Sequence, residues 1–287
     1  MKIRRIFFAV VFLLFAFSAQ AQRDPVAIMQ ELQKLGWQRG PGEGKIGPRA
    51  TIKVAEGYTF LDDKNTRRFL ELMGNPPRDN HYLISPANLD WFAVFSFDPV
   101  GFVKDDEKID AEALLDSLKK GDGPGNEERK RLGMSPIYTD GWHVPPHYDS
   151  GTKRLEWGMR LRDEKGGLHV NYTSRLLGRS GVMSAILVSS PQTLGEDMKA
   201  FNSALAGYDF IAGEKYAEFK SGDKIAEYGL AALVVGGAAA AAAKGGLFKW
   251  LGKFLWVIIG GAAMGGWALF KKLFGRKEAP PPSPGQQ

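Results

Sequence analysis

The stretch over residues 142–149, Trp-His-Val-Pro-Pro-His-Tyr-Asp, holds the residue types best suited to chemistry. Two histidines and an aspartate can bind a metal ion or work as a general acid–base pair. Pro145-Pro146 favours polyproline II, in which four residues advance about 12 Å and place the two imidazoles on different faces. We therefore expect an ordered loop in which His143 and His147 do not share a zinc ion. His147 and Asp149 are kept as candidate catalytic residues.

A second candidate is the acidic turn over residues 98–107. A calcium loop of the EF-hand type beginning at Asp105 requires glycine at its sixth position, where Asp110 stands. We therefore predict no metal and no cofactor. Asp105 and Asp106 are kept as candidate catalytic residues, because a neighbouring loop could bring them to His147. That arrangement would make the chain an envelope hydrolase or a metal-dependent enzyme.

Two glycine-rich stretches fail the tests for known catalytic loops. In residues 40–47, Ile46 follows Lys45 where a phosphate-binding loop needs serine or threonine, so we predict a flexible loop. Residues 178–181, Gly-Arg-Ser-Gly, lack the Gly-x-Ser-x-Gly nucleophile elbow and have the composition of a hairpin turn. The chain contains no cysteine, which excludes disulfides, zinc ribbons and thiol chemistry.

The periodicity of the apolar residues predicts an α+β domain with a mainly antiparallel sheet and flanking helices. Apolar and polar residues alternate over 155–161 and 168–173, and the run 182–188 follows. This pattern predicts an antiparallel meander with one solvated face. Residues 91–97 are apolar on both faces, as expected of a central, covered strand.

Turn and capping residues place the remaining elements. Strands at 51–54 and 58–60 flank Glu56-Gly57 and predict a tight hairpin. Asp62 or Asp63 is expected to cap a helix that runs through Met73. Further helices are predicted over 26–35, 110–120 and 191–205.

The N-terminus has the three parts of a secretory signal. Lys2, Arg4 and Arg5 precede an unbroken apolar run over 6–17, and Ala19-Gln20-Ala21 supplies a cleavage site. We predict a signal peptide over 1–21 and export of residues 22–220 as one domain. In a double-membrane bacterium that domain would lie in the periplasm.

The C-terminal quarter predicts an anchor in the inner membrane over residues 221–274. Residues 226–243 and 247–270 are two apolar segments separated by Lys244-Gly245-Gly246. They suit a hairpin of two helices packed through small residues, which we slightly favour. A single span through 254–270 is the alternative, because it leaves the four basic residues of 271–277 in the cytoplasm. The proline-rich tail, 275–287, is predicted to be disordered.

The positive charge lies beside the apolar segments rather than on the exported domain. The chain carries a net charge of +6, with +3 in residues 1–21 and +6 in residues 244–287, so residues 22–243 carry −3. Phosphate backbones are recognised by a basic face on the folded part of a protein. We therefore predict that nucleic acid is not a partner.

A series of short blocks resembles a predicted membrane-anchored family, domain of unknown function 2167. The blocks follow one order over nearly all of the chain after the signal: Glu56-Gly57-Tyr58-Thr59-Phe60-Leu61-Asp62, Gly74-Asn75-Pro76-Pro77, Gly101-Phe102-Val103-Lys104-Asp105-Asp106, Gly141-Trp142, Pro145-Pro146-His147-Tyr148-Asp149, Leu155-Glu156-Trp157, Asn171-Tyr172, Leu177-Gly178-Arg179 and Gly222-Asp223-Lys224-Ile225-Ala226-Glu227-Tyr228-Gly229. The resemblance implies a signal peptide, an exported domain and a C-terminal anchor. It implies no activity and no catalytic residue.

Together these observations favour binding over catalysis. The expected protein is a membrane-anchored module of the cell envelope, exposed to the periplasm. Its expected partners are the membrane and either another envelope protein or a second copy of the chain. The alternative is the enzyme that would use His147, Asp149 and the nearby acids.

Overall fold

The computed structural model describes residues 25–73, 75, 77–131 and 135–236. The chain divides into a unit ending at Lys34 and a second unit beginning at Leu35, and each is described by itself. The first unit holds helix α1 (Pro25–Gln33), close to the predicted bounds. The predicted signal peptide and tail lie outside the described residues, as does the predicted anchor beyond residue 236.

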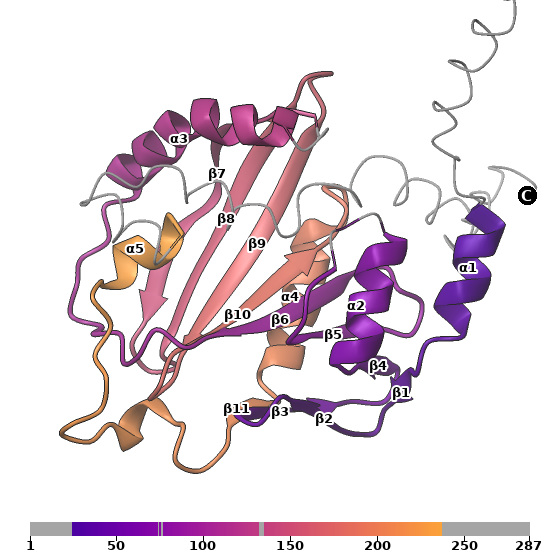
Figure 1. Ribbon diagram of the computed structural model, residues 1–287, viewed down its shortest axis with the longest axis horizontal. Helices are drawn as coiled ribbons and strands as arrows, with labels where there is room; N and C mark the ends of the chain where they lie inside the picture. The colour runs from indigo at the N-terminus through magenta and orange to yellow at the C-terminus, as the bar shows by residue number, and fades with distance from the viewer. Residues whose placement is uncertain (1–24, 74, 76, 132–134, 237–287) are drawn as a thin grey trace, which may run out of the picture. The chain divides into compact units, whose positions relative to one another are not determined.

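A large antiparallel sheet forms the centre of the second unit (Figure 1). It has eight strands, in the order β1 (Gln38–Arg39), β4 (Tyr58–Leu61), β5 (His81–Pro86), β6 (Phe92–Asp98), β10 (Val182–Val188), β9 (Leu168–Leu177), β8 (Arg154–Asp163) and β7 (Ile137–Asp149). A smaller antiparallel sheet has the order β11 (Tyr208–Phe210), β3 (Ala50–Val54) and β2 (Gly42–Ile46).

Helices cover both faces of the large sheet. Helix α4 (Leu194–Leu205) and the small sheet cover one face, where Met183 of β10 lies in a buried cluster with Phe201. The preceding residue, Val182, faces the opposite way because side chains alternate along a strand. It lies in a second cluster with α3 (Ala111–Arg131) and α5 (Leu230–Val234). Helix α2 (Asp63–Leu72) covers the other end of that face, with Phe69 against Phe92.

The expected antiparallel sheet with flanking helices is confirmed, together with several of its local elements. Strands β8, β9 and β10 form the predicted meander, and β6 lies between β5 and β10 as a central strand. Asp62 caps α2 by accepting a hydrogen bond from the Asn65 amide, at 3.0 Å. One face of β8 is expected to be exposed to solvent. Arg160 and Arg162 on that face are exposed, but Glu156 is buried.

The predicted hairpin of 51–54 with 58–60 is wrong. Strand β3 pairs with β2 and β11, whereas β4 joins the large sheet between β1 and β5. The predicted loop at 40–47 is also wrong, because β2 occupies most of it. A side chain at Gly44 would come within 2.6 Å of the Phe60 ring. The glycine therefore lets the small sheet pack closely on the large one, a purpose that composition alone does not show.

Two further boundaries differ from the prediction for tertiary reasons. Residues 142–149 belong to strand β7, with register shifts against β8, instead of forming a loop. Helix α3 continues past Gly121 and includes Pro124. Its second half is bound to β7, since the Asn126 side chain bonds both the amide and the carbonyl of Ile137, each at 2.9 Å. These bonds outweigh the weak helical propensity of glycine and proline.

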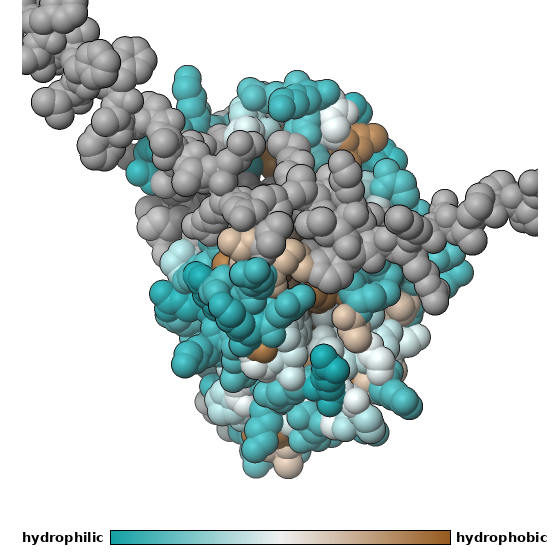
Figure 2. Space-filling view, turned by 90° about the vertical axis from the view of Figure 1, so that its right-hand side faces the viewer, coloured by the Kyte–Doolittle hydropathy of each residue, from teal (hydrophilic) through white to brown (hydrophobic). Residues whose placement is uncertain are grey.

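The described chain continues past residue 220 into the buried core. Leu230, Leu233 and Val234 of α5 are 0%, 1% and 6% exposed. Among the described residues, no helix has the length and apolar character needed to cross a membrane. In the side view of Figure 2 the described surface is mainly hydrophilic, with hydrophobic residues at separate positions.

Candidate functional site

The structure gives Asp149 a local role at the end of β7. One carboxylate oxygen accepts a hydrogen bond from the Gly151 amide at 2.8 Å, and the other accepts one from the Thr152 hydroxyl at 2.7 Å. These two bonds, the Thr152 bond first, lower the pKa of Asp149. The carboxylate therefore fixes the turn from β7 to β8.

His147 and Asp105 lie on opposite faces of β7. The imidazole Nε2 of His147 is 3.6 Å from the carboxylate of Glu156, on the face that α4 covers. The next residue, Tyr148, points the other way and donates a hydrogen bond to Asp105 at 2.7 Å. Strand alternation thus separates His147 and Asp149 from Asp105. Asp106 is exposed in the same loop as Asp105. The four predicted residues do not form one site.

Asp105 is the centre of a different cluster, on the α5 face. It accepts hydrogen bonds from Tyr148 and from the Lys153 ammonium, the latter at 2.8 Å. Lys153 has the left-handed φ of 55°, and its ammonium lies 4.9 Å from the centre of the Tyr216 ring. Partial burial opposes ionisation of Asp105, but the bonds from Lys153 and the tyrosines outweigh it and lower the pKa of Asp105. Burial first, and Asp105 second, raise the pKa of Tyr148 far above its usual value. Tyr148 is therefore a fixed neutral donor.

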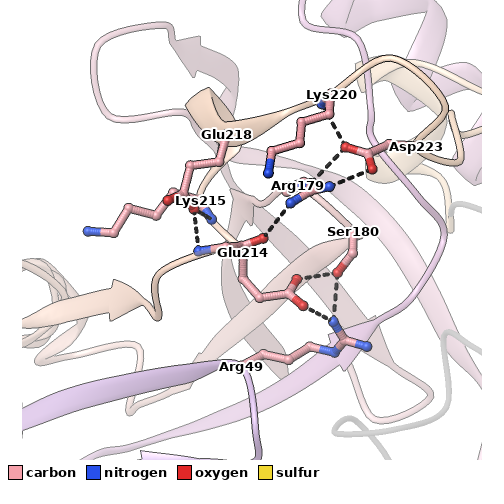
Figure 3. Close-up of polar contacts among 9 residues, drawn as sticks. Arg49, Arg179, Ser180, Glu214, Lys215, Glu218, Lys220 and Asp223 are labelled. Carbon is pink, nitrogen blue, oxygen red and sulfur yellow. Dashed lines mark hydrogen bonds and ion pairs between the residues drawn. The ribbon is translucent and has the colours of Figure 1, made fainter.

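A polar cleft forms where three separate segments meet (Figure 3). They are the loop after β6, the turn from β9 to β10, and the segment 211–225 between β11 and α5. The cleft has a volume of about 310 Å³ and is lined by Gly101, Arg179, Ser180, Gly213, Glu214, Asp223 and Lys224. We call it the β9–β10 cleft.

A bidentate ion pair closes one side of the β9–β10 cleft. The Nε and Nη2 atoms of Arg179 each donate to a different oxygen of Asp223, both at 2.7 Å. The Lys220 amide donates to the same carboxylate, also at 2.7 Å. These donors, Arg179 first, lower the pKa of Asp223 to about 2. Paired, planar contacts of this kind fix geometry as well as charge.

A second network on the other side joins Ser180, Glu214 and Arg49. Ser180 donates to Glu214, and Arg49 pairs with Glu214 and donates to the Ser180 oxygen at 2.8 Å. The Arg49 guanidinium lies 4.8 Å above the centre of the Phe97 ring. A serine beside a carboxylate could suggest a nucleophile and its base. One oxygen of Glu214 is bonded to Arg49 and the other to Ser180, however, so the arrangement suits positioning and polar recognition.

Backbone contacts hold the last part of the segment 211–225 against the loop after β6. Phe102 donates to the Lys224 carbonyl at 2.8 Å, and Ala226 donates back to the Phe102 carbonyl at 2.9 Å. Gly101 allows this approach, since its φ is 99° and a Cβ there would lie 2.6 Å from the Lys224 oxygen. The described residues contain no group of three acidic, histidine or cysteine side chains placed to hold a metal ion.

No local motif in the sequence marks the residues of this cleft as a site. The composition of 178–181 predicts only a turn, and residues from 221 onward are predicted to belong to the membrane anchor. The signal that could have found them is that Arg179 and Asp223 each stand in a block shared with the resembled family. Their contact, across 44 positions, depends on the fold.

Three comparisons with known proteins add to this geometry. A family model described as "Protein of unknown function (DUF2167)" matches residues 38–265. The search of curated proteins gave no match. Among solved structures, the chain is similar to the solution structure of cyanobacterial PsbP (CyanoP) from Synechocystis sp. PCC 6803. The identity is 12% and the TM-score 0.34, over 61% of this chain and 92% of that chain.

Proposed function

The chain belongs to the DUF2167 family of proteins of unknown function, and we propose that it is an exported binding module of the cell envelope. In this proposal the C-terminal apolar segment anchors it in the inner membrane of a double-membrane bacterium, and the domain lies in the periplasm. The β9–β10 cleft receives a polar, juxtamembrane segment of another envelope protein.

The observation that carries this proposal is that two ion pairs hold the segment 211–225 in place. We call these two contacts the clamp. Arg179 holds Asp223, and Arg49 with Ser180 holds Glu214, so two walls of the cleft are fixed by ion pairs. A site that is rigid before binding loses little conformational entropy when a partner is bound. The same segment continues into α5 and then into the predicted anchor, which supports a binding site near the bilayer.

The chemistry of the cleft supports recognition of a polar ligand. The carboxylates of Glu214 and Asp223 are already paired, and the amides of Gly101 and Gly213 already donate to the Ser180 carbonyl and to Glu218. The exposed Lys224 at the opening is the donor that a ligand can reach. A peptide segment that carries a carboxylate would complement this ammonium group.

Site-specific photocrosslinking in native membranes tests the proposal. A photoreactive residue is introduced at Lys224 in the full chain, and a matched one at Lys199, which is exposed on α4. We expect position 224 to crosslink reproducibly to one envelope protein, and the yield to fall several-fold in Arg179→Ala, which releases Asp223. The same products from positions 224 and 199 would contradict the proposal. Self-crosslinks alone from position 224 would replace it with a homo-oligomer.

A further inference from the structure

We propose that part of the segment 211–225 lies directly on an anionic lipid surface. The part of the protein that would contact the lipid consists of Phe102, Phe219, Lys220, Lys224 and Ile225. We call it the headgroup surface. This inference rests on the membrane anchor of the proposed function. It adds a second, reversible contact, which would orient the domain and its cleft relative to the bilayer.

The apolar part of the headgroup surface is exposed and continuous. Phe219 is 37% and Ile225 46% exposed. The Phe102 ring lies 4.2 Å from the Phe219 ring, and Phe102 forms a bridge with Ile225, so the three residues meet at one place. Three of the five large hydrophobic residues exposed among the described residues fall within 211–225: Ile211, Phe219 and Ile225. Aromatic and aliphatic side chains in such a group are typical of the membrane–water interface.

Three acidic side chains beside this surface are already bound, and its two lysines are exposed. Asp223 is held by Arg179, Glu214 is held by Arg49, and Glu218 accepts hydrogen bonds from two backbone amides. Lys220 and Lys224 are exposed, and neither ammonium forms an ion pair within the described residues. In Figure 3 the Lys220 side chain extends away from Asp223, which its amide contacts. Two exposed lysines beside exposed apolar side chains complement an anionic headgroup layer.

The length of the chain limits how far this surface can lie from the bilayer. The described chain ends at residue 236, and the apolar segment predicted to enter the membrane begins at residue 247. Ten residues span at most about 36 Å when fully extended. Because α5 is buried in the domain, the tether begins close in sequence to Ile225. The end of the domain that carries residues 219–225 can therefore reach the headgroups.

The test places a fluorescent label at this surface in the full chain. The protein has no cysteine, so Ser221→Cys gives a single labelling site that leaves Phe219 and Ile225 in place. Ser203→Cys, exposed on α4, gives the matched control label. Each protein is reconstituted into vesicles of phosphatidylcholine, with or without phosphatidylglycerol, and lipid-borne quenchers report contact of the label with the bilayer. We expect quenching at position 221 in the anionic vesicles, and little at position 203.

Charge-reversing substitutions measure how much the two lysines contribute to docking. Each lysine near an anionic surface contributes about fivefold to binding, so loss of Lys220 and Lys224 lowers the docked-to-undocked ratio about 30-fold. Lys220→Glu with Lys224→Glu also adds repulsion and should lower the ratio by at least that factor. Lys53→Glu with Lys199→Glu makes the same change of net charge elsewhere and should keep the quenching. Equal quenching at positions 221 and 203, or no loss in neutral vesicles, would overturn the headgroup surface.

Extraction with alkaline carbonate separates the two proposals. Release of the full chain from the vesicles would overturn the anchor and, with it, the headgroup surface. Retention of the protein without quenching at position 221 would overturn the headgroup surface alone and leave the anchor standing.

Discussion

At the scale of single residues, Asp223 determines how the segment 211–225 is held. Its carboxylate accepts two hydrogen bonds from Arg179 and one from the Lys220 amide. All three donors favour the ionised carboxylate, which is why the pKa of Asp223 falls to about 2 from the usual 3.8. Ionisation of Asp223 thus stabilises the folded domain through its bonds to Arg179 and Lys220.

The pH dependence of stability tests this contribution. A carboxyl group whose pKa is lower in the folded state stabilises the fold above its unfolded pKa, and this stabilisation is lost as the pH falls through the folded value. Asp223→Asn should therefore lower the free energy of unfolding by a constant amount above about pH 5. The difference from the wild type should shrink as the pH falls below 3.8 and be lost once the pH is below the folded pKa of about 2.

Unfolding of the full chain in detergent, followed by tryptophan fluorescence across this pH range, provides the measurement. Asp116→Asn, which removes an exposed carboxylate on α3, controls for the loss of one charge. A difference between Asp223→Asn and the wild type that does not change with pH would show that ionisation of Asp223 has no part in the clamp.

At the scale of elements, α5 connects the domain to the predicted anchor. It is only five residues long, and such a helix is not stable by itself in water. Burial of Leu230 and Leu233 against the sheet stabilises it, and the Glu107 carboxylate accepts a hydrogen bond from the Ala231 amide at 3.0 Å. Residues 230–234 therefore act as part of the domain core, although their composition resembles that of a membrane segment.

Truncation of Leu233 distinguishes a core element from a membrane element. Leu233 is 1% exposed, so Leu233→Ala should lower the free energy of unfolding of the domain by about 2–5 kcal/mol. Leu255→Ala makes the same truncation inside the predicted anchor and should leave that free energy unchanged. Equal and small effects at the two positions, measured by denaturant unfolding in detergent, would contradict the packing of α5.

At the scale of the whole molecule, the place of α5 bears on the number of membrane spans. The two-helix hairpin, which the sequence slightly favours, requires residues 226–243 to cross the bilayer, but the described part of that segment, through residue 236, includes α5 and its buried leucines. The apolar segment 247–270 remains for a single span. A single span would place Lys271, Lys272, Arg276 and Lys277 in the cytoplasm, as the positive-inside rule favours.

We therefore expect the domain and the C-terminal tail to lie on opposite sides of the membrane. Ser203→Cys should react with a membrane-impermeant thiol reagent in spheroplasts, whereas Ser283→Cys should react only after permeabilisation. The cysteine-free chain makes each label specific and serves as the unlabelled control. Reaction of both positions in intact spheroplasts would support the two-helix hairpin instead.

The sequence by itself determined the features that neighbouring residues encode. The cap of α2 at Asp62 and the meander of β8, β9 and β10 follow from local hydrogen bonding and from a periodicity of two. Tertiary structure alone decided that β3 and β4 enter different sheets and that α3 continues through Pro124. It also brought Arg49 to Glu214 across 165 positions of the chain. Such contacts depend on how whole elements bury their apolar faces together, and no short stretch of sequence records that outcome.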